Sequence, residues 1–293
     1  MPRRGVLLAV VALLVGAGIG AGALLLTRAS GSVRAVEKTR RPPERFRKQT
    51  PPAPSVLRLS ASAPGGTLTL PILMYHRIDA LAPSLVPITR RLTVAPADFA
   101  AQMRWLKRHG FHAVSQLQAF DALERGGHLP AKPIMITFDD GYRDVYKNAL
   151  PVLVRLRIPA TAYVITGRIG GPDPSFLTWG ELRILERGGV AIGSHTVTHA
   201  DLTALDDAHA LAELRDSRAI LQRRLHHPVQ WFAYPYGAED ARVVALARRA
   251  GYVLAVTTRP GDTQSAATPL ELRRDEILDT TGVSGLAALL RVP

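Results

Sequence analysis

From residue 70 onward, short apolar segments alternate with longer segments whose apolar residues recur at helical spacing. In one of the longer segments, Phe99, Met103 and Leu106 follow a proline, and residues 207–225 show the same periodicity. This alternation predicts an α/β fold, an irregular or incomplete (β/α)7-type barrel with its chemistry at the carboxyl ends of the strands. The segments expected to form strands are 71–75, 111–114, 134–138, 160–165, 190–193, 231–233 and 252–257.

The N-terminal segment has a different pattern. Residues 5–26 are 22 consecutive uncharged, mostly apolar positions after Arg3 and Arg4, which is the length of a transmembrane helix. A cleavable signal peptide has a shorter apolar core. We therefore expect a membrane anchor within residues 1–26, with a signal peptide as the alternative, and the membrane as a partner.

The net charge of +13 indicates a nucleic-acid partner only if the charge lies on the folded domain. Residues 27–50 instead carry eight basic and two acidic side chains, and with Arg3 and Arg4 they account for +8 of the total. Residues 27–68 also contain six prolines and little apolar periodicity, which predicts a disordered linker. The domain expected at 69–293 is only mildly basic and lacks aromatic–basic alternation, so no nucleic-acid partner is expected.

Two adjacent carboxylates, Asp139 and Asp140, end one predicted strand. Neighbouring carboxylates disfavour each other's ionisation unless a cation binds them, although one of them could instead cap a helix. His195 and His199 end another strand, and on a helical turn their four-residue spacing would place both imidazoles on one face. Because the chain has no cysteine, any metal must bind histidine and carboxylate. Two imidazoles and one carboxylate suit a divalent metal, and the second carboxylate is then free to act as a base.

Two weaker signals lie at other strand ends. Tyr234, Pro235 and Tyr236 begin a turn that could direct a backbone N–H at a developing oxyanion, although an ordinary turn would have the same sequence. His76 follows the first predicted strand. A single histidine of this kind is usually structural.

Together these four elements resemble the polysaccharide deacetylases of carbohydrate esterase family four. TFDDG at 137–141 matches the family's first motif, the histidine pair of SHTVTH at 194–199 its second, and YPYG at 234–237 its third. The resemblance extends over about residues 70–280. It implies a hydrolase that uses Zn²⁺ or another divalent metal to remove N-acetyl or O-acetyl groups from an acetylated polysaccharide.

The resemblance also implies roles for individual residues. Asp139 would be the general base that takes the proton of the attacking water. Asp140, His195 and His199 would hold the metal, and the backbone N–H of Tyr236 would help to bind the oxyanion.

The chain departs from the commoner family pattern in two ways. Ala233 and Tyr234 stand where an arginine and a second proline usually precede the motif tyrosine, and no histidine follows His227 to serve as the general acid. Both departures resemble the branch that acts on poly-N-acetylglucosamine, in which an early tyrosine–histidine element supplies the acid. His76 fits that position.

The orienting arginine that this pattern lacks could be replaced from later in the chain. Arg273 and Arg274 are the two candidates, and the sequence leaves the choice between them open. Tyr234 and Pro235 are further candidates for contacting the substrate or orienting the base.

Two other classes of function remain open. A non-catalytic carbohydrate-binding protein on the same fold would be expected to lose the base or a ligand, and this chain keeps all four residues. An iron oxygenase could use the two imidazoles and one carboxylate, but Asp139 would then have no role.

The expected location follows from the implied polymer substrates, which lie in the cell envelope or beyond it. Basic residues after the apolar segment argue for a cytoplasmic domain, but long domains can translocate despite flanking charge. We expect a single-pass protein of the inner or cell membrane with an extracytoplasmic catalytic domain.

Overall fold

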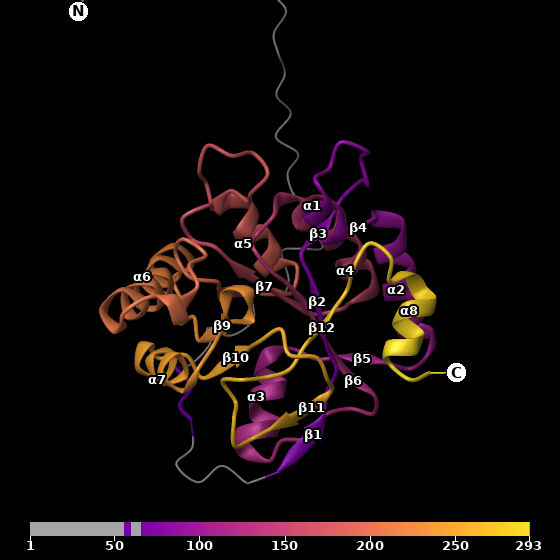
Figure 1. Cartoon of the computed structure of the whole chain (residues 1–293). Coiled ribbons are helices and arrows are strands. Elements are labelled where there is room, and N and C mark those ends of the chain that lie inside the picture. The colour runs from indigo at the N-terminus through magenta and orange to yellow at the C-terminus, as the bar shows by residue number, and fades with distance from the viewer. Residues whose placement is uncertain (1–55, 60–65, 293) are drawn as a thin grey trace, which may run out of the picture. The chain divides into compact units, whose positions relative to one another are not determined.

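The computed structural model describes residues 56–59 and 66–292 (Figure 1). The predicted membrane anchor and most of the predicted linker lie outside these residues. Within the described part of the chain, no helix combines the length and the apolar character needed to cross a membrane.

An eight-stranded parallel sheet forms the centre of the domain. The strand order is β10-β9-β8-β7-β6-β2-β12, and β5 pairs with the start of β6. A parallel bridge between Val256 and Leu272 links β10 to the segment just before β12, at the other end of this order. The strands are β2 (Ile72–Tyr75), β5 (His112–Ala113), β6 (Pro133–Phe138), β7 (Ala160–Val164), β8 (Val190–Ser194), β9 (Trp231–Ala233), β10 (Leu254–Val256) and β12 (Asp275–Glu276).

Seven of these strands coincide with the predicted segments, and the α/β prediction is confirmed. The curled parallel sheet fits the predicted irregular barrel (Figure 1). β12 was not predicted, because two acidic residues carry no apolar pattern; it forms where Asp275 and Glu276 pair with Leu73 and Met74 of β2.

Helices surround the sheet and begin where local sequence favours them (Figure 1). Ser115 and Thr178 each start a helix with a reciprocal capping box, which satisfies otherwise unpaired N–H groups. The helices at 96–108 and 207–225 match the predicted periodicity. The helices are α1 (Pro87–Arg91), α2 (Pro96–Arg108), α3 (Gln116–Arg125), α4 (Leu150–Leu156), α5 (Trp179–Arg187), α6 (Asp207–Leu225), α7 (Ala241–Ala250) and α8 (Gly282–Leu289).

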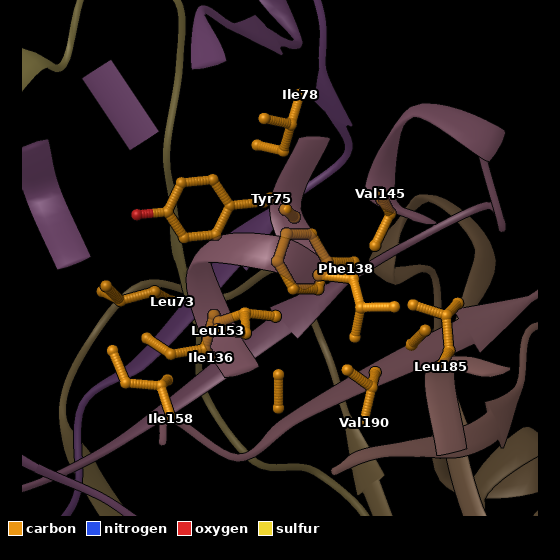
Figure 2. Packing of buried hydrophobic residues seen from close by; sticks show 14 of the residues in the cluster. Leu73, Tyr75, Ile78, Ile136, Phe138, Val145, Leu153, Ile158, Leu185 and Val190 are labelled. Atoms are coloured by element: carbon orange, nitrogen blue, oxygen red, sulfur yellow. The ribbon is translucent and has the colours of Figure 1, made fainter. Parts of the chain in front are cut away.

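Successive side chains of β6 point alternately to the apolar cluster outside the sheet and to the interior of the barrel. Ile136 and Phe138 point outward into the cluster that includes Tyr75 and Leu153 (Figure 2). Because side chains alternate along a strand, Met135 and Thr137 lie on the opposite face, and Asp139 continues that face beyond the end of the strand. The apolar pattern of β6 thus directs Asp139 toward the inside of the barrel.

Two pieces of the segment predicted as a disordered linker are ordered. Leu57 is buried, and its backbone N–H and C=O both pair with the side-chain amide of Gln230, at 2.7 and 2.8 Å. β1 (Thr67–Thr69) begins two residues before the expected domain boundary and pairs with β11 (Thr263–Ser265). The linker prediction was too long at its C-terminal end because a single buried leucine and a three-residue strand leave no periodic signal.

A second small sheet joins β3 (Arg77–Ile78) to β4 (Thr93–Val94).

Candidate active site

Asp139 is the buried carboxylate at the end of β6, and Arg274 lies directly against it. The guanidinium donates from Nη1 to Oδ1 at 2.8 Å and from Nη2 to Oδ2 at 2.7 Å. The same arginine donates to the Thr257 carbonyl and to the Thr137 hydroxyl. Its side chain is completely buried, so the bidentate pair fixes the orientation of Asp139.

This pair also sets the charge of Asp139. Burial by itself would raise the pKa of the carboxyl, but the attraction and hydrogen bonds of Arg274 outweigh burial and lower the pKa to about 2. Asp139 is therefore ionised at neutral pH. Arg273 is exposed and donates to the Pro260 carbonyl at 3.1 Å, so of the two candidate arginines the structure brings only Arg274 to Asp139.

Asp140, His195 and His199 form a second group beside this pair. The Nε2 atoms of His195 and His199 lie 3.6 and 3.5 Å from Oδ1 of Asp140, and all three potential ligand atoms lie within 4.8 Å of one another. Two donors about 2.1 Å from a tetrahedral zinc ion are separated by about 3.4 Å. The donor set and its spacing therefore fit a divalent metal.

The two imidazoles are prepared for this role by their surroundings. Nδ1 of His195 faces the Ala233 carbonyl at 2.8 Å, which favours the tautomer with Nδ1 protonated and Nε2 free to bind a metal. Burial lowers the pKa of His199, and the neighbouring His195 lowers it further. Both effects favour neutral imidazole, the form that binds metal.

The backbone of this segment differs from the sequence interpretation. Residues 195–199 form an irregular bend, and Thr196 and His199 have φ angles of 63° and 68°. The four-residue spacing therefore does not act through a helical turn, although the two imidazoles do lie together, with ring centroids 4.7 Å apart. The left-handed backbone at Thr196 and His199 brings the two rings together. In a helix, the 3.6-residue repeat would have done so.

The predicted turn after β9 lies beside the histidines. Pro235–Gly237 form one 3₁₀ turn, in which Tyr236 has a φ of 59°. Tyr236 is 67% exposed, and the centroid of its ring lies 4.5 Å from that of His199. Tyr234 is instead completely buried against Phe232, so its side chain packs in the core and does not face the site.

His76 follows β2 on the same side of the domain. It lies close enough to Asp139 and His199 for a charge on its ring to lower the pKa of both groups, and its Nδ1 is buried with no hydrogen-bond partner among the described residues. A buried polar atom without a partner is uncommon. The structure therefore brings His76 to the same site as the aspartates and the histidine pair.

Sequence reasoning missed the residues that support the site. Glu213 of α6 accepts hydrogen bonds from the segment between the two histidines. The Ala233 carbonyl orients His195. Neither had a detectable signal, because one is an acidic residue on a helix surface and the other is a backbone atom.

Comparisons with known proteins agree with this geometry. The sequence profile of the family described as polysaccharide deacetylase matches residues 126–255. YxkH of Bacillus subtilis, which is itself assigned to the polysaccharide deacetylases, is 31% identical over 218 residues, or 74% of each chain. A poly-beta-1,6-N-acetyl-D-glucosamine N-deacetylase of Staphylococcus aureus is 26% identical over 174 residues, which are 55% of this chain and 60% of that protein.

Solved structures show the same similarity. The deacetylase PplD of Streptococcus pyogenes, in complex with acetate, has a TM-score of 0.70 and 30% identity, covering 77% of this chain and 99% of that one. IcaB from Ammonifex degensii has a TM-score of 0.65 and 27% identity, covering 76% of this chain and 97% of that one. The chain belongs to the polysaccharide deacetylase family.

Proposed function

We propose that this polysaccharide deacetylase is metal-dependent and that Asp140, His195 and His199 hold the metal. The observation that carries the proposal is the cluster of three potential ligand atoms within 4.8 Å of one another. The neighbouring carboxylate, Asp139, is paired with Arg274 and is not part of the cluster. Zinc is the metal proposed, because two imidazoles and one carboxylate form a common catalytic zinc set. Other divalent metals suit the same ligands.

Asp139 is proposed as the general base. When bound, the metal would polarise the acetyl carbonyl and lower the pKa of a coordinated water. Asp139 is ionised at neutral pH because its pKa is held at about 2, so it can accept a proton. Arg274 occupies one side of both carboxylate oxygens and leaves their other lone pairs for that proton.

His76 and Tyr236 are proposed for the remaining steps. The unpartnered Nδ1 of His76 supports a role in which this side chain gives a proton to the leaving amine. The backbone N–H of Tyr236 would stabilise the oxyanion, and the left-handed φ of that residue supports a backbone held for a specific contact.

The proposed substrate is a polymer of N-acetylglucosamine, cleaved at its amide bonds. The name of the Staphylococcus aureus relative, a poly-beta-1,6-N-acetyl-D-glucosamine N-deacetylase, supports this choice over an acetyl ester. An O-acetylated glycan is the second candidate.

The test is acetate release from a panel of N- and O-acetylated glycans by the purified full chain. We expect release from the N-acetylglucosamine polymer, loss of release after chelation, and recovery on adding zinc. His199→Ala is the matched control for metal-independent hydrolysis. Glycan binding without acetate release by the zinc-loaded protein would favour the non-catalytic carbohydrate-binding function.

The catalytic domain is proposed to lie outside the cytoplasm, tethered by residues 5–26. The length of that apolar segment and the polymer substrate support this location. Alkaline phosphatase fused to the C-terminus should be active, and a cytoplasm-only fluorescent protein should be dark. The reverse pattern would contradict the proposal.

A further inference from the structure

The bend that carries the histidine pair has an unfavourable backbone. Thr196 and His199 both have left-handed φ angles, and residues in this conformation are strained and persist only where the surrounding structure imposes it. For Thr196 the strain is greater than for most residues because its side chain is β-branched. Within the bend the His199 N–H donates to the Thr196 hydroxyl at 2.9 Å, and contacts from outside the bend add to this hydrogen bond.

We propose that Glu213 is the positioning residue that holds this bend in the form that binds metal. Its Oε2 accepts the backbone N–H groups of Val197 and Thr198 at 2.8 and 3.0 Å. Its Oε1 accepts the Thr198 hydroxyl at 2.8 Å. One carboxylate of α6 thus binds three donors from the two residues that immediately precede His199.

The opposite side of the bend is fixed by backbone contacts. The Gly167 N–H donates to the Val197 carbonyl at 2.9 Å, and the Thr166 N–H donates to the Thr196 carbonyl at 3.1 Å. A Cβ at position 167 would lie 2.6 Å from the Val197 oxygen. The bend is therefore held between the loop after β7 on one side and Glu213 on the other.

Glu213 acts through geometry and is not itself a ligand. The cluster of potential ligand atoms among the described residues contains Asp140, His195 and His199 without it. Residues that orient metal ligands typically change metal affinity by about 10–100-fold when they are removed.

The inference rests on the proposed metal site, and it makes a specific prediction about three substitutions. Glu213→Gln keeps the side-chain length, so its oxygen can accept both N–H groups while its amide donates to the Thr198 hydroxyl. Glu213→Asp keeps the charge but withdraws the carboxylate by one methylene. Glu213→Ala removes both. If geometry is what matters, Gln preserves metal affinity better than Asp.

The experiment measures zinc and cobalt affinity of the purified full chain by competition with a chromogenic chelator. Glu213→Ala should lose about 10–100-fold in affinity, Glu213→Asp should lose most of the same amount, and Glu213→Gln should lose least. Asp216→Ala is the matched control, since Asp216 is an exposed acid on the same helix. It should bind metal as the unmodified chain does.

Two further readouts separate positioning from general stability. The melting temperature of each metal-free variant reports folding, and hydrogen exchange of a peptide covering residues 195–199 reports the bend. We expect faster exchange of this peptide in Glu213→Ala and Glu213→Asp, beyond any change in α6. If Glu213→Ala does not fold, the Asp and Gln variants still test the proposal.

Three results would overturn the inference. They are unchanged affinity in Glu213→Ala and Glu213→Asp, better affinity in Asp than in Gln, and unchanged exchange of the bend. The second would indicate a long-range effect of charge. A different failure, in which the unmodified chain binds no metal or His199→Ala binds it equally well, would instead contradict the proposed metal site.

Discussion

The two halves of the site are held in place by opposite means. In the base half, Asp139 extends a regular strand and is oriented by the completely buried Arg274. In the ligand half, Asp140 and His199 have left-handed φ angles of 72° and 68°, and the bend is held by hydrogen bonds to its backbone. The base half therefore depends on a pair of side chains, and the ligand half depends on backbone conformation.

This difference decides how each half should fail. Removing one member of a buried ion pair leaves the other charge without compensation. Removing a ligand, in contrast, leaves no buried charge unpaired, and its main effect is on the affinity for metal. Substitutions that lower stability without changing metal affinity, or lower metal affinity without changing stability, test whether the two halves are independent.

The largest effect is expected from the ligand half. His195→Ala and His199→Ala should each abolish stoichiometric zinc binding and, with it, activity, because either change leaves only two protein ligands. Metal content after dialysis and acetate release measure the two effects. Stoichiometric zinc in both variants would refute the ligand assignment.

Asp139→Asn should separate metal binding from activity. The metal should remain, because Asp139 is not part of the ligand cluster, while the rate should fall by roughly 10²-fold or more if general-base catalysis contributes as usual. Metal analysis and single-turnover rates on the same preparation check this. Loss of zinc would instead make Asp139 a ligand.

Arg274→Met tests the buried pair itself. It should destabilise the domain by about 3–5 kcal/mol, because the Asp139 charge is left buried and unpaired. Arg273→Met is the matched control, since Arg273 is exposed, and should change stability little. Denaturant unfolding measures both.

The same pair predicts a pH dependence with a defined sign. The pKa of Asp139 is about 2, below its ordinary value of 3.8. The stabilisation of the folded domain by ionised Asp139 is therefore present above about pH 4 and is lost as the pH falls from about 4 to about 2. In Arg274→Met burial dominates and raises the pKa, so the acid limb of the rate profile should move to higher pH. An unmoved limb would show that Arg274 does not control the charge of Asp139.

His76→Ala tests the histidine that lies close to Asp139 in one half of the site and to His199 in the other. Turnover should fall by roughly 10²-fold or more with metal content unchanged, because a general acid typically contributes at least that much. A wild-type rate would mean that the proton comes from elsewhere.

The smallest effect is expected at an ion pair remote from the described ligand cluster. His227 bonds Glu186 at 2.6 Å, and that hydrogen bond raises the pKa of His227 above its ordinary 6.5. The pair should stabilise the protein below pH 6.5 and cease to do so as the pH rises through the raised pKa. His227→Gln should remove less than about 1 kcal/mol at pH 6 and leave acetate release unchanged.

Local sequence determined much of this protein. Buried strands give continuous apolar segments, so the parallel sheet was predictable, and the aspartates and histidines were recognisable because each follows such a segment. The short acidic β12 and the ordered Leu57 were not, since their stability comes from partners far along the chain: β2 pairs with one and Gln230 with the other.

Only the tertiary structure decided between Arg273 and Arg274. Neighbouring residues of an extended segment point to opposite faces, and nothing in the sequence states which face is the interior. The pairing of Asp275 with Leu73 sets that register and places Arg274 against Asp139. Glu213 was likewise hidden, because its contact with the histidine bend depends on how α6 packs, and packing is a property of the folded chain.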